Sequence, residues 1–331
     1  MNSDTFLKLF QYEKIEGIIK EPIKEIVIDS RKVTNGSAFV CVDGFTVDGH
    51  EFVEQAIEKG ASVIIAEKEI ESAIPVIYVR NTKLTLQRLA PLFYQMPSQQ
   101  LKMIGVTGTN GKTTVAHMIH QYLTKLHEKS AVIGTIGFQL ENQLFETDNT
   151  TPNVLDTQKL LHQAVVSDAD TVTMEVSSHG LIEGRLAGVN FDIAIFTNLS
   201  HDHLDFHGTM EHYGYAKGLL FAQLGQDLTQ DKAVILNADD VWSNRYRQMS
   251  PFPFQTYGFS NEADFRIEIV QKAIEQTTFF LHGNNTTYSL STHLLGAYNL
   301  SNLIAATLAV VAKGYPLEEV LALLPEIDAP K

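Results

Sequence analysis

The chain contains 331 residues, 44% of them hydrophobic, which is enough for two folded domains and excludes large-scale disorder. Its formal net charge of −14 at pH 7 argues against a general nucleic-acid-binding protein, because nucleic-acid phosphates are bound by clustered Lys and Arg. The single cysteine, Cys41, excludes an intramolecular disulfide and a cysteine-based zinc site, and it fits a reducing compartment.

Residues 1–97 are predicted to form a first α/β domain. Strands are expected at 25–28, 38–42, 62–66 and 75–79, alternating with helices near 51–59 and 84–94. Cys41 lies inside one of these apolar runs, so we interpret it as a buried strand residue and not as a nucleophile. The Met96-Pro97-Ser98 break is interpreted as a linker.

Residues 98–331 are predicted to form a second α/β domain with a mostly parallel sheet. Strands are expected at 101–106, 131–135, 170–176, 191–197 and 233–236, and helices at 114–126, 154–165, 299–312 and 317–324. Apolar strands between helices are typical of a parallel sheet with both faces covered. The alternating run 265–291, with a turn at Gly283-Asn284-Asn285, indicates a small antiparallel addition.

No segment approaches the roughly 18 consecutive apolar residues of a membrane span. The N-terminus lacks the basic and apolar regions of a signal peptide. We therefore expect a cytoplasmic protein that does not insert into a membrane.

The stretch Gly105–Thr114 is predicted to be a phosphate-binding loop between a buried strand and a helix. In such a loop the backbone N–H groups converge on phosphates, and the helix N-terminus adds partial positive charge. Lys112 would neutralise the β and γ oxygens of a nucleoside triphosphate, and the Thr113 hydroxyl would ligate Mg²⁺. The spacing departs from G-x-x-x-x-G-K-[ST], because Val106 stands five residues before Gly111. The alternative is a Gly-rich turn whose lysine is merely exposed.

A carboxylate is predicted at the end of another strand. Glu175 lies in the run Thr173–Gly180, at the C-terminal end of strand 170–176. Ligands of open α/β sheets gather outside the carboxyl ends of strands, so Glu175 could reach a Mg²⁺ held by the phosphate-binding loop. The alternative interpretation is that Glu175 caps the helix that follows.

The run Asn198–Gly208 contains three histidines and two aspartates directly after strand 191–197. Its composition invites a metal-site interpretation. It resembles the H-x-H-x-D-H run of metallo-β-lactamase-like hydrolases, although the pattern here is H-x-H-x-D-x-H. The alternative is a polar loop of solvated or hydrogen-bonded side chains. We predict that one histidine of the run is a metal ligand, and a metallohydrolase using the His201–His207 cluster is a competing hypothesis.

Two further features are weaker. The polar turn Asp148–Asn153 precedes helix 154–165, where hydroxyls, an amide and free N–H groups could bind an anionic or polyhydroxy ligand or could simply cap the helix. Lys217 lies in the helical stretch Tyr213–Phe221, where a lysine is by default a solvated surface residue. Neither feature identifies a function by itself.

Taken in chain order, five segments resemble the Mur ligase family. They are Gly108–Thr114, Asn149–Pro152, Met174–Gly180, Asn198–Gly208 and Ala297–Asn302. In the first domain, Asp29-Ser30-Arg31 and Asp48-Gly49-His50 match the family's UDP-binding domain. The resemblance is closest to members that add the third peptide residue to UDP-N-acetylmuramoyl-L-alanyl-D-glutamate in peptidoglycan biosynthesis.

The resemblance implies a ligase that uses ATP and Mg²⁺ and joins an amino acid to the D-glutamate carboxylate through an acyl phosphate. The expected ATP contacts are Gly108, Thr109, Asn110, Gly111, Lys112, Thr113, Thr114 and Asn299. Thr113 and Glu175 would hold one Mg²⁺, and His203 a second. Lys217 matches a lysine that the family carbamylates, which would convert it into a carboxylate able to position that metal. Lys112, Lys217, Glu175 and His203 are thus the expected catalytic residues.

For the UDP-linked substrate, the resemblance places Ser30 near the uridine and five residues along the muramoyl dipeptide. These are Asn149, Thr150, Thr151, Ser177 and Arg185. Arg185 suits a carboxylate because its guanidinium can bind two oxygens at once. Glu183 stands where some relatives have glutamine, and its negative charge would face an anionic substrate. A monomer that binds no nucleic acid is expected.

Family members continue from a linker like Ala329-Pro330-Lys331 into a third domain that binds the incoming amino acid and closes over ATP. We therefore expect this chain to lack that domain, to bind ATP and the UDP-linked dipeptide, and to ligate poorly by itself. Which amino acid is added, diaminopimelate or lysine, stays open. A competing hypothesis is a nucleotide- or UDP-sugar-binding protein of the same fold without ligase activity.

Overall fold

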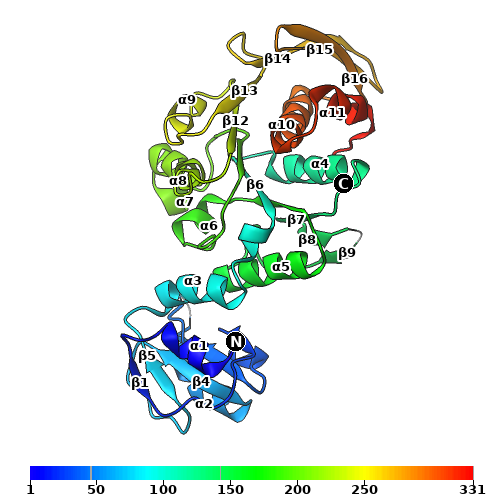
Figure 1. The fold of residues 1–331 in the computed structure, drawn as a ribbon. Helices are drawn as coiled ribbons and strands as arrows, with labels where there is room; N and C mark the ends of the chain where they lie inside the picture. Colours follow the sequence, from blue (N-terminus) through cyan, green and yellow to red (C-terminus); the bar gives the residue numbers. More distant parts are fainter. Residues whose placement is uncertain (45–46, 142, 331) are drawn as a thin grey trace. The chain divides into compact units, whose positions relative to one another are not determined.

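The computed structural model describes residues 1–44, 47–141 and 143–330 and contains two compact units, Met1–Met96 and Pro97–Lys331 (Figure 1). The division falls inside the segment that was interpreted as a linker. Lys331, the last residue of the predicted linker at the other end, lies outside the described residues. Within the described ranges, no helix is long and apolar enough to cross a membrane.

The first unit is built on a sheet in which the described strands have the order β1-β5-β4-β3-β2. Its strands are β1 (Lys14–Glu16), β2 (Glu25–Val27), β3 (Ser37–Val40), β4 (Ala61–Ala66) and β5 (Val76–Tyr78), and its helices are α1 (Ser3–Lys8), α2 (Val53–Glu58) and α3 (Thr82–Phe93). β1 runs antiparallel to β5, whereas the other pairs are parallel. Cys41 directly follows β3 and is fully buried, and burial raises the pKa of its thiol to about 12, which agrees with the structural role expected for it.

The helix predicted near 51–59 is shorter than expected. The chain first forms a 3₁₀ turn, Gly49–Phe52, where the Asp48 side chain accepts a hydrogen bond from the His50 backbone N–H at 3.0 Å. An aspartate that bonds the backbone two residues ahead competes with the helical hydrogen bond. The α-helix therefore begins only at Val53.

The second unit contains a larger sheet, whose described strands follow the order β16-β15-β14-β13-β12-β11-β6-β10-β7-β8-β9. The strands are β6 (Lys102–Thr107), β7 (Ser130–Gly134), β8 (Gly137–Leu140), β9 (Gln143–Phe145), β10 (Thr171–Glu175), β11 (Ile193–Phe196), β12 (Ala233–Asn237), β13 (Phe254–Gly258), β14 (Phe265–Lys272), β15 (Thr277–Gly283) and β16 (Thr286–Thr292). The pairs from β14 to β7 are parallel, whereas β15, β16, β8 and β9 extend the two edges in antiparallel fashion. The predicted mostly parallel sheet with an antiparallel addition is confirmed.

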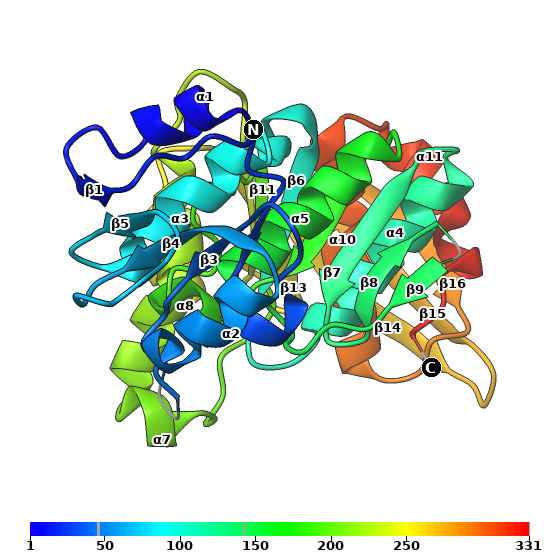
Figure 2. The same ribbon diagram turned by 90° about the horizontal axis from the view of Figure 1, so that it is seen from below.

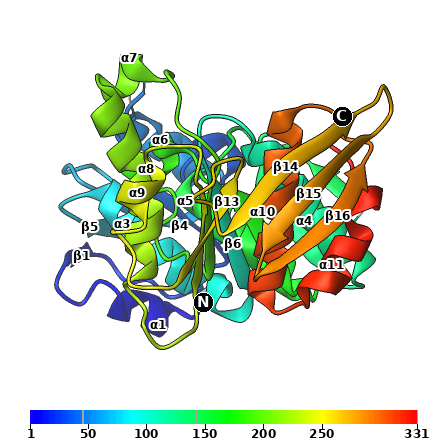
Figure 3. The ribbon, with the colours of Figure 1, turned by 90° about the horizontal axis from the view of Figure 1, so that it is seen from above.

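Helices cover both faces of this sheet (Figures 1 and 3). One layer consists of α4 (Lys112–Lys125), α10 (Ala297–Lys313) and α11 (Leu317–Leu323); the other contains α5 (Val154–Val166), α6 (Ser178–Ile182), α8 (Met210–Leu224) and α9 (Ser243–Tyr246), with the short α7 (Leu204–His207) before α8. The central strand β6 alternates between the two cores. Ile104 and Val106 pack against the first layer and Met103 against the second, as the two-residue period of a strand requires.

One of the two antiparallel extensions of the sheet was predicted from the sequence, and the other was not. The predicted turn between β15 and β16 is present, and Asn284 and Asn285 both have positive φ, 53° and 59°, as the central residues of a type I′ hairpin turn do. The β8–β9 hairpin, which continues the sheet beyond β7 (Figure 2), was not predicted. Its strands are too short to display a clear alternation of apolar and polar residues.

Candidate nucleotide and substrate site

Three of the loops singled out in the sequence meet at one edge of the large sheet. β6 is flanked by β10 and β11, and all three strands are parallel. The carboxyl ends of parallel strands lie at the same edge, and ligand sites of open α/β sheets form there. Lys112, Glu175 and Asn198 follow or end these three strands, so the fold brings them into one site.

Two glycines with positive φ shape the phosphate-binding loop. φ is 150° at Gly108 and 86° at Gly111. A Cβ added to Gly108 would lie 1.9 Å from the Thr197 hydroxyl oxygen, and one added to Gly111 would lie 2.5 Å from the side-chain oxygen of Asn302, so no larger residue fits. Val106, where the usual motif has glycine, is instead a fully buried residue of β6.

Asn198 holds the loop through three hydrogen bonds. Its carbonyl accepts from the Thr109 N–H at 2.7 Å, its side-chain oxygen accepts from the Asn110 N–H at 3.1 Å, and its side-chain nitrogen donates to the Asn110 carbonyl at 3.0 Å. Asn198 and Asn302 were quoted within motifs but were not predicted as site residues, because their partners lie far away in sequence.

We expect Gly108→Ala to disrupt this loop, because the added methyl group would overlap the Thr197 hydroxyl. The free energy of unfolding should fall by about 3 kcal/mol or more, from overpacking and backbone strain together. Gly208→Ala is a matched control: φ is 74° there, no described atom lies within 4 Å of the added Cβ, and the loss should be only about 1 kcal/mol. Urea unfolding measures both, and equal losses would contradict the close contact.

Glu175 is fully buried at the end of β10, and three groups bind its carboxylate. It accepts hydrogen bonds from the Thr113 hydroxyl at 2.8 Å, the Thr135 backbone N–H at 2.8 Å and the Thr135 hydroxyl at 3.1 Å. The capping interpretation of Glu175 is wrong, because Ser177 caps α6 by accepting from the Gly180 N–H at 3.0 Å. Thr113 and Glu175 thus present adjacent oxygen atoms of the kind that Mg²⁺ prefers.

Two lysines converge on the carbonyl of Gly108. Lys112 donates to it at 2.8 Å and to the Thr109 carbonyl at 2.9 Å, and Lys217 on α8 donates to it at 2.9 Å. Lys217 is only 1% exposed, so the surface interpretation of this residue is wrong. Burial, together with the nearby positive charge of Lys112, holds the pKa of Lys217 well below its usual range, and burial also lowers the pKa of Lys112.

The histidines of the Asn198–Gly208 run differ in their surroundings. His207 is buried, with its Nε2 2.9 Å from the Ser178 hydroxyl. His203 is exposed at the start of α7, with φ of 51°, and its ring lies edge-on to His179 with ring centroids 5.1 Å apart. In the part of the chain that the structure describes, no three His, Cys, Asp or Glu residues are grouped to hold a metal ion.

The 148–153 turn combines a cap with accessible groups. Asn153 caps α5 by accepting from the Asp156 N–H at 3.0 Å, so the capping interpretation holds for this residue. Thr151 is fully buried, and its hydroxyl donates to the Glu175 carbonyl at 2.9 Å and accepts from the Ser177 N–H at 3.0 Å. Thr151 therefore shapes the turn, whereas Asn149 is exposed and Thr150 half-buried.

Arg185 is oriented by its neighbours. Its guanidinium donates to the Thr151 carbonyl at 2.9 Å and to the Glu183 carboxylate at 2.8 Å. The closest contact of this ion pair is 2.7 Å. The negative charge of Glu183 is thus offset by Arg185, which limits its repulsion of an anionic ligand.

The two remaining predicted contacts lie elsewhere in the chain. In the first unit, Ser30 is buried in the 3₁₀ turn Ser30–Lys32, where its hydroxyl donates to the Gln55 side chain. In the second unit, Asn299 lies in the first turn of α10, and its side-chain amide donates to the Leu295 carbonyl at 2.9 Å. Asn302, three residues further along α10, is the residue of this helix whose side-chain oxygen lies beside Gly111 of the loop.

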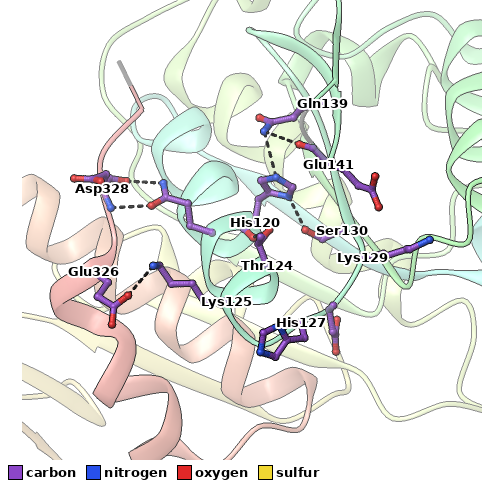
Figure 4. Close-up of a pocket in the computed structure, with 12 residues that line it drawn as sticks. His120, Thr124, Lys125, His127, Lys129, Ser130, Gln139, Glu141, Glu326 and Asp328 are labelled. Carbon is purple, nitrogen blue, oxygen red and sulfur yellow. Dashed lines mark hydrogen bonds and ion pairs between the residues drawn. The ribbon is translucent and has the colours of Figure 1, made fainter.

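A cavity of about 750 Å³ lies at the other end of α4 (Figure 4). It is lined by Thr124, twelve residues along the helix from Lys112, or about 18 Å at the usual rise per residue. Lys125 in its wall pairs with Glu326 at 2.8 Å, and the Gln121 side chain exchanges two hydrogen bonds of 2.9 Å with the backbone of Asp328. This cavity is therefore separate from the nucleotide site.

A Gly-rich loop between a buried strand and a helix, with a carboxylate at the end of the neighbouring strand, is typical of α/β nucleotide-binding proteins. Residues 22–94 match the description "Mur ligase family, catalytic domain", and residues 106–310 match "Mur ligase middle domain". The chain belongs to the Mur ligase family, as the resemblance of its motifs predicted.

Individual relatives are similar over nearly the whole chain. UDP-N-acetylmuramoyl-L-alanyl-D-glutamate--L-lysine ligases of Staphylococcus aureus (strain MW2) and Staphylococcus haemolyticus (strain JCSC1435) are each 41% identical over 99% of this chain, which spans 67% of their length. A solved UDP-N-acetylmuramoyl-L-alanyl-D-glutamate--2,6-diaminopimelate ligase has a TM-score of 0.83 and 30% identity over 98% of this chain and 67% of its own. MurF ligase from Thermotoga maritima in complex with ADP shares the fold, with a TM-score of 0.65 and 20% identity over 91% of this chain and 66% of its own.

Proposed function

We propose that this chain carries the nucleotide and acceptor-substrate sites of a cytoplasmic ATP-dependent ligase that acts on UDP-N-acetylmuramoyl-L-alanyl-D-glutamate in peptidoglycan synthesis. The observation that supports the proposal is that Glu175 contacts both the phosphate-binding loop and the 148–153 turn. Its carboxylate accepts from Thr113 of the phosphate-binding loop at 2.8 Å, and its carbonyl accepts from Thr151 of the 148–153 turn at 2.9 Å. The phosphate-binding loop and the 148–153 turn are therefore adjacent. The names of the relatives, which state this substrate, support the same assignment.

The proposed chemistry has two steps. A D-glutamate carboxylate oxygen attacks the γ-phosphorus of ATP, and the bond from that phosphorus to the β–γ bridging oxygen breaks as ADP leaves. The amino group of the incoming amino acid then attacks the acyl carbon, the bond from this carbon to the former carboxylate oxygen breaks, and that oxygen leaves as part of inorganic phosphate. The nitrogen loses a proton as the amide forms. Lys112 would exchange the carbonyls of Gly108 and Thr109 for phosphate oxygens, offsetting the charge on the transferring group.

The residues present fit Mg²⁺ at the start of α4. The Thr113 hydroxyl and the Glu175 carboxylate are both oxygen donors and already touch, and Glu175 is held in place by Thr135. A bound Mg²⁺ would neutralise phosphate charge. We assign His203 and Lys217 to a second ion, His203 because it is exposed at the loop and Lys217 on the condition that it is carbamylated.

Carbamylation of Lys217 is chemically reasonable in this environment. The neutral amine is the form that attacks carbon dioxide, forming an N–C bond and losing a proton, and burial keeps the pKa of Lys217 low. The product carries a negative charge, which would interact favourably with the nearby Lys112 ammonium.

The acceptor substrate is assigned to the accessible groups beside Glu175. Asn149, Thr150 and Ser177 offer hydrogen bonds, and Arg185 offers a guanidinium that Glu183 and Thr151 already orient toward one position. The relatives' names give L-lysine or 2,6-diaminopimelate as the incoming amino acid, and both supply the primary amine that the second step needs.

A thermal-shift titration of the chain tests this function. Mg-ATP and UDP-N-acetylmuramoyl-L-alanyl-D-glutamate should each raise Tm, because a ligand at a hundred times its Kd stabilises the folded state by about 2.7 kcal/mol. Lys112→Ala should lose most of the shift with Mg-ATP and keep the shift with the UDP-linked substrate. If neither ligand raised Tm, the proposal would be wrong. Release of ADP when both are present would distinguish a ligase from a protein that only binds them.

A further inference from the structure

Four side chains form a continuous hydrogen-bonded chain from the phosphate-binding loop to the 148–153 turn. The Thr113 hydroxyl donates to Glu175 Oε2 at 2.8 Å, and the Thr135 hydroxyl donates to the same oxygen at 3.1 Å. The Thr135 and Thr150 hydroxyl oxygens are 3.0 Å apart. Thr135 follows β7, so a third strand end links the two sites.

The hydrogen bonds of this chain have a fixed direction. A threonine hydroxyl has one hydrogen and two lone pairs. The Thr135 hydroxyl uses its single hydrogen in the bond to Glu175 Oε2, so Thr150 must donate its own hydrogen to Thr135. The Thr150 hydroxyl then has only its lone pairs available for a ligand. It can accept an N–H or O–H from the substrate but cannot donate to a carboxylate or phosphate.

Thr135 holds the Glu175 carboxylate and does not contribute to packing of the core. Its backbone N–H donates to the other Glu175 oxygen at 2.8 Å, so main chain and side chain hold the carboxylate together. At the preceding Gly134, a Cβ would lie 2.1 Å from Glu175 Oε1, so the carboxylate rests directly on the backbone there. The Thr135 side chain itself is exposed, so its hydroxyl is not needed to fill the core.

We propose that Thr135 is a positioning residue that couples binding of the Mg-nucleotide to binding of the acceptor substrate. The inference rests on the proposed function, because it requires those two ligands. In the ligand-free chain, Thr113 and Thr135 both donate to Glu175 Oε2. Mg²⁺ bound between Thr113 and Glu175 would replace the Thr113 hydrogen bond, so the Thr135 hydroxyl would be the remaining donor to that oxygen. Thr135 in turn accepts from Thr150, whose hydroxyl is assigned to the substrate. Coupling between binding sites is reciprocal, so each ligand should tighten the other by the same factor.

Calorimetry with the whole chain tests the coupling. Kd for UDP-N-acetylmuramoyl-L-alanyl-D-glutamate is measured without and with saturating Mg-AMP-PNP, and the ratio of the two is the coupling factor. In the wild type we expect a factor of about tenfold, the size of one hydrogen bond to a charged group. Thr135→Val, which keeps the shape and removes the hydroxyl, should bring the factor close to one, whereas Thr135→Ser should restore it.

A second pair of variants tests the hydrogen bond between Thr135 and Thr150 by changing Thr150. Thr150→Val should also abolish the coupling factor and Thr150→Ser should retain it, even where the Kd values themselves change. Unliganded Tm values of all four variants report on folding. A wild-type factor of one, or a factor unchanged in either valine variant, would overturn the role of Thr135. Failure of the wild type to bind either ligand would instead overturn the proposed function.

Discussion

Glu175→Gln should abolish Mg²⁺-dependent nucleotide binding. The substitution keeps the size of the side chain but removes the charge that would attract the ion, and metal affinity should fall by about 100-fold or more. The new NH₂ group would also face donors, because Thr113 and Thr135 both donate to this carboxylate. A buried donor left without an acceptor costs about 1–3 kcal/mol, so the free energy of unfolding should fall as well.

The effects of Glu175→Gln on metal and on folding can be separated by calorimetry with and without Mg²⁺. AMP-PNP should bind more tightly to the wild type when Mg²⁺ is present, and this gain should be missing in the variant. Binding without Mg²⁺ should be similar in both proteins. A variant that kept the full Mg²⁺ gain would remove Glu175 from the ion site.

Lys217→Met should stabilise the fold while removing the side chain that we propose is carbamylated. Lys217 is 1% exposed, and the nearby Lys112 repels its charge, so its ionised form is costly in the folded protein. Methionine fills a similar volume without a charge, and the gain should be about 1–3 kcal/mol in carbon dioxide-free buffer. A loss of stability there would mean that the hydrogen bond to Gly108 outweighs the burial cost.

The pH dependence of unfolding provides a further test of the Lys217 environment. The pKa of Lys217 is depressed in the folded protein, so the unfolded chain binds a proton that the folded chain does not. Stability from this group therefore rises with pH between the depressed pKa and the unfolded value of about 10.4. The wild type should gain stability from pH 7 to 9 relative to Lys217→Met.

With ¹³C-labelled bicarbonate, a carbamate NMR signal should appear in the wild type and be absent from the variant.

The parts of the site that were predicted from sequence depend on local patterns. The loop Gly108–Thr114 follows a buried strand and begins a helix, so its strand–loop–helix arrangement could be predicted from about a dozen residues. Glu175 was found because strand ends of a parallel sheet meet at one edge. Both inferences need the order of elements along the chain but not their exact packing.

Other parts of the site depend on contacts between distant segments. Thr135 and Asn198 act through partners 40 and 88 residues away, and a threonine or asparagine after a strand has no pattern that reveals such a partner. The burial of Lys217 did have a signal. Its neighbours Ala216 and Gly218 and the nearby Leu220 and Phe221 are also buried, so α8 is enclosed around most of its surface, which a run of small and apolar residues indicates.

A crystal structure of the chain with Mg-AMP-PNP and UDP-N-acetylmuramoyl-L-alanyl-D-glutamate tests the central claim most directly. The account predicts the triphosphate against Gly108–Thr114, Mg²⁺ between Thr113 and Glu175, and a D-glutamate carboxylate oxygen about 3–3.5 Å from the γ-phosphorus, the separation of a near-attack geometry. A nucleotide bound elsewhere, or a dipeptide carboxylate directed away from the γ-phosphate, would contradict it.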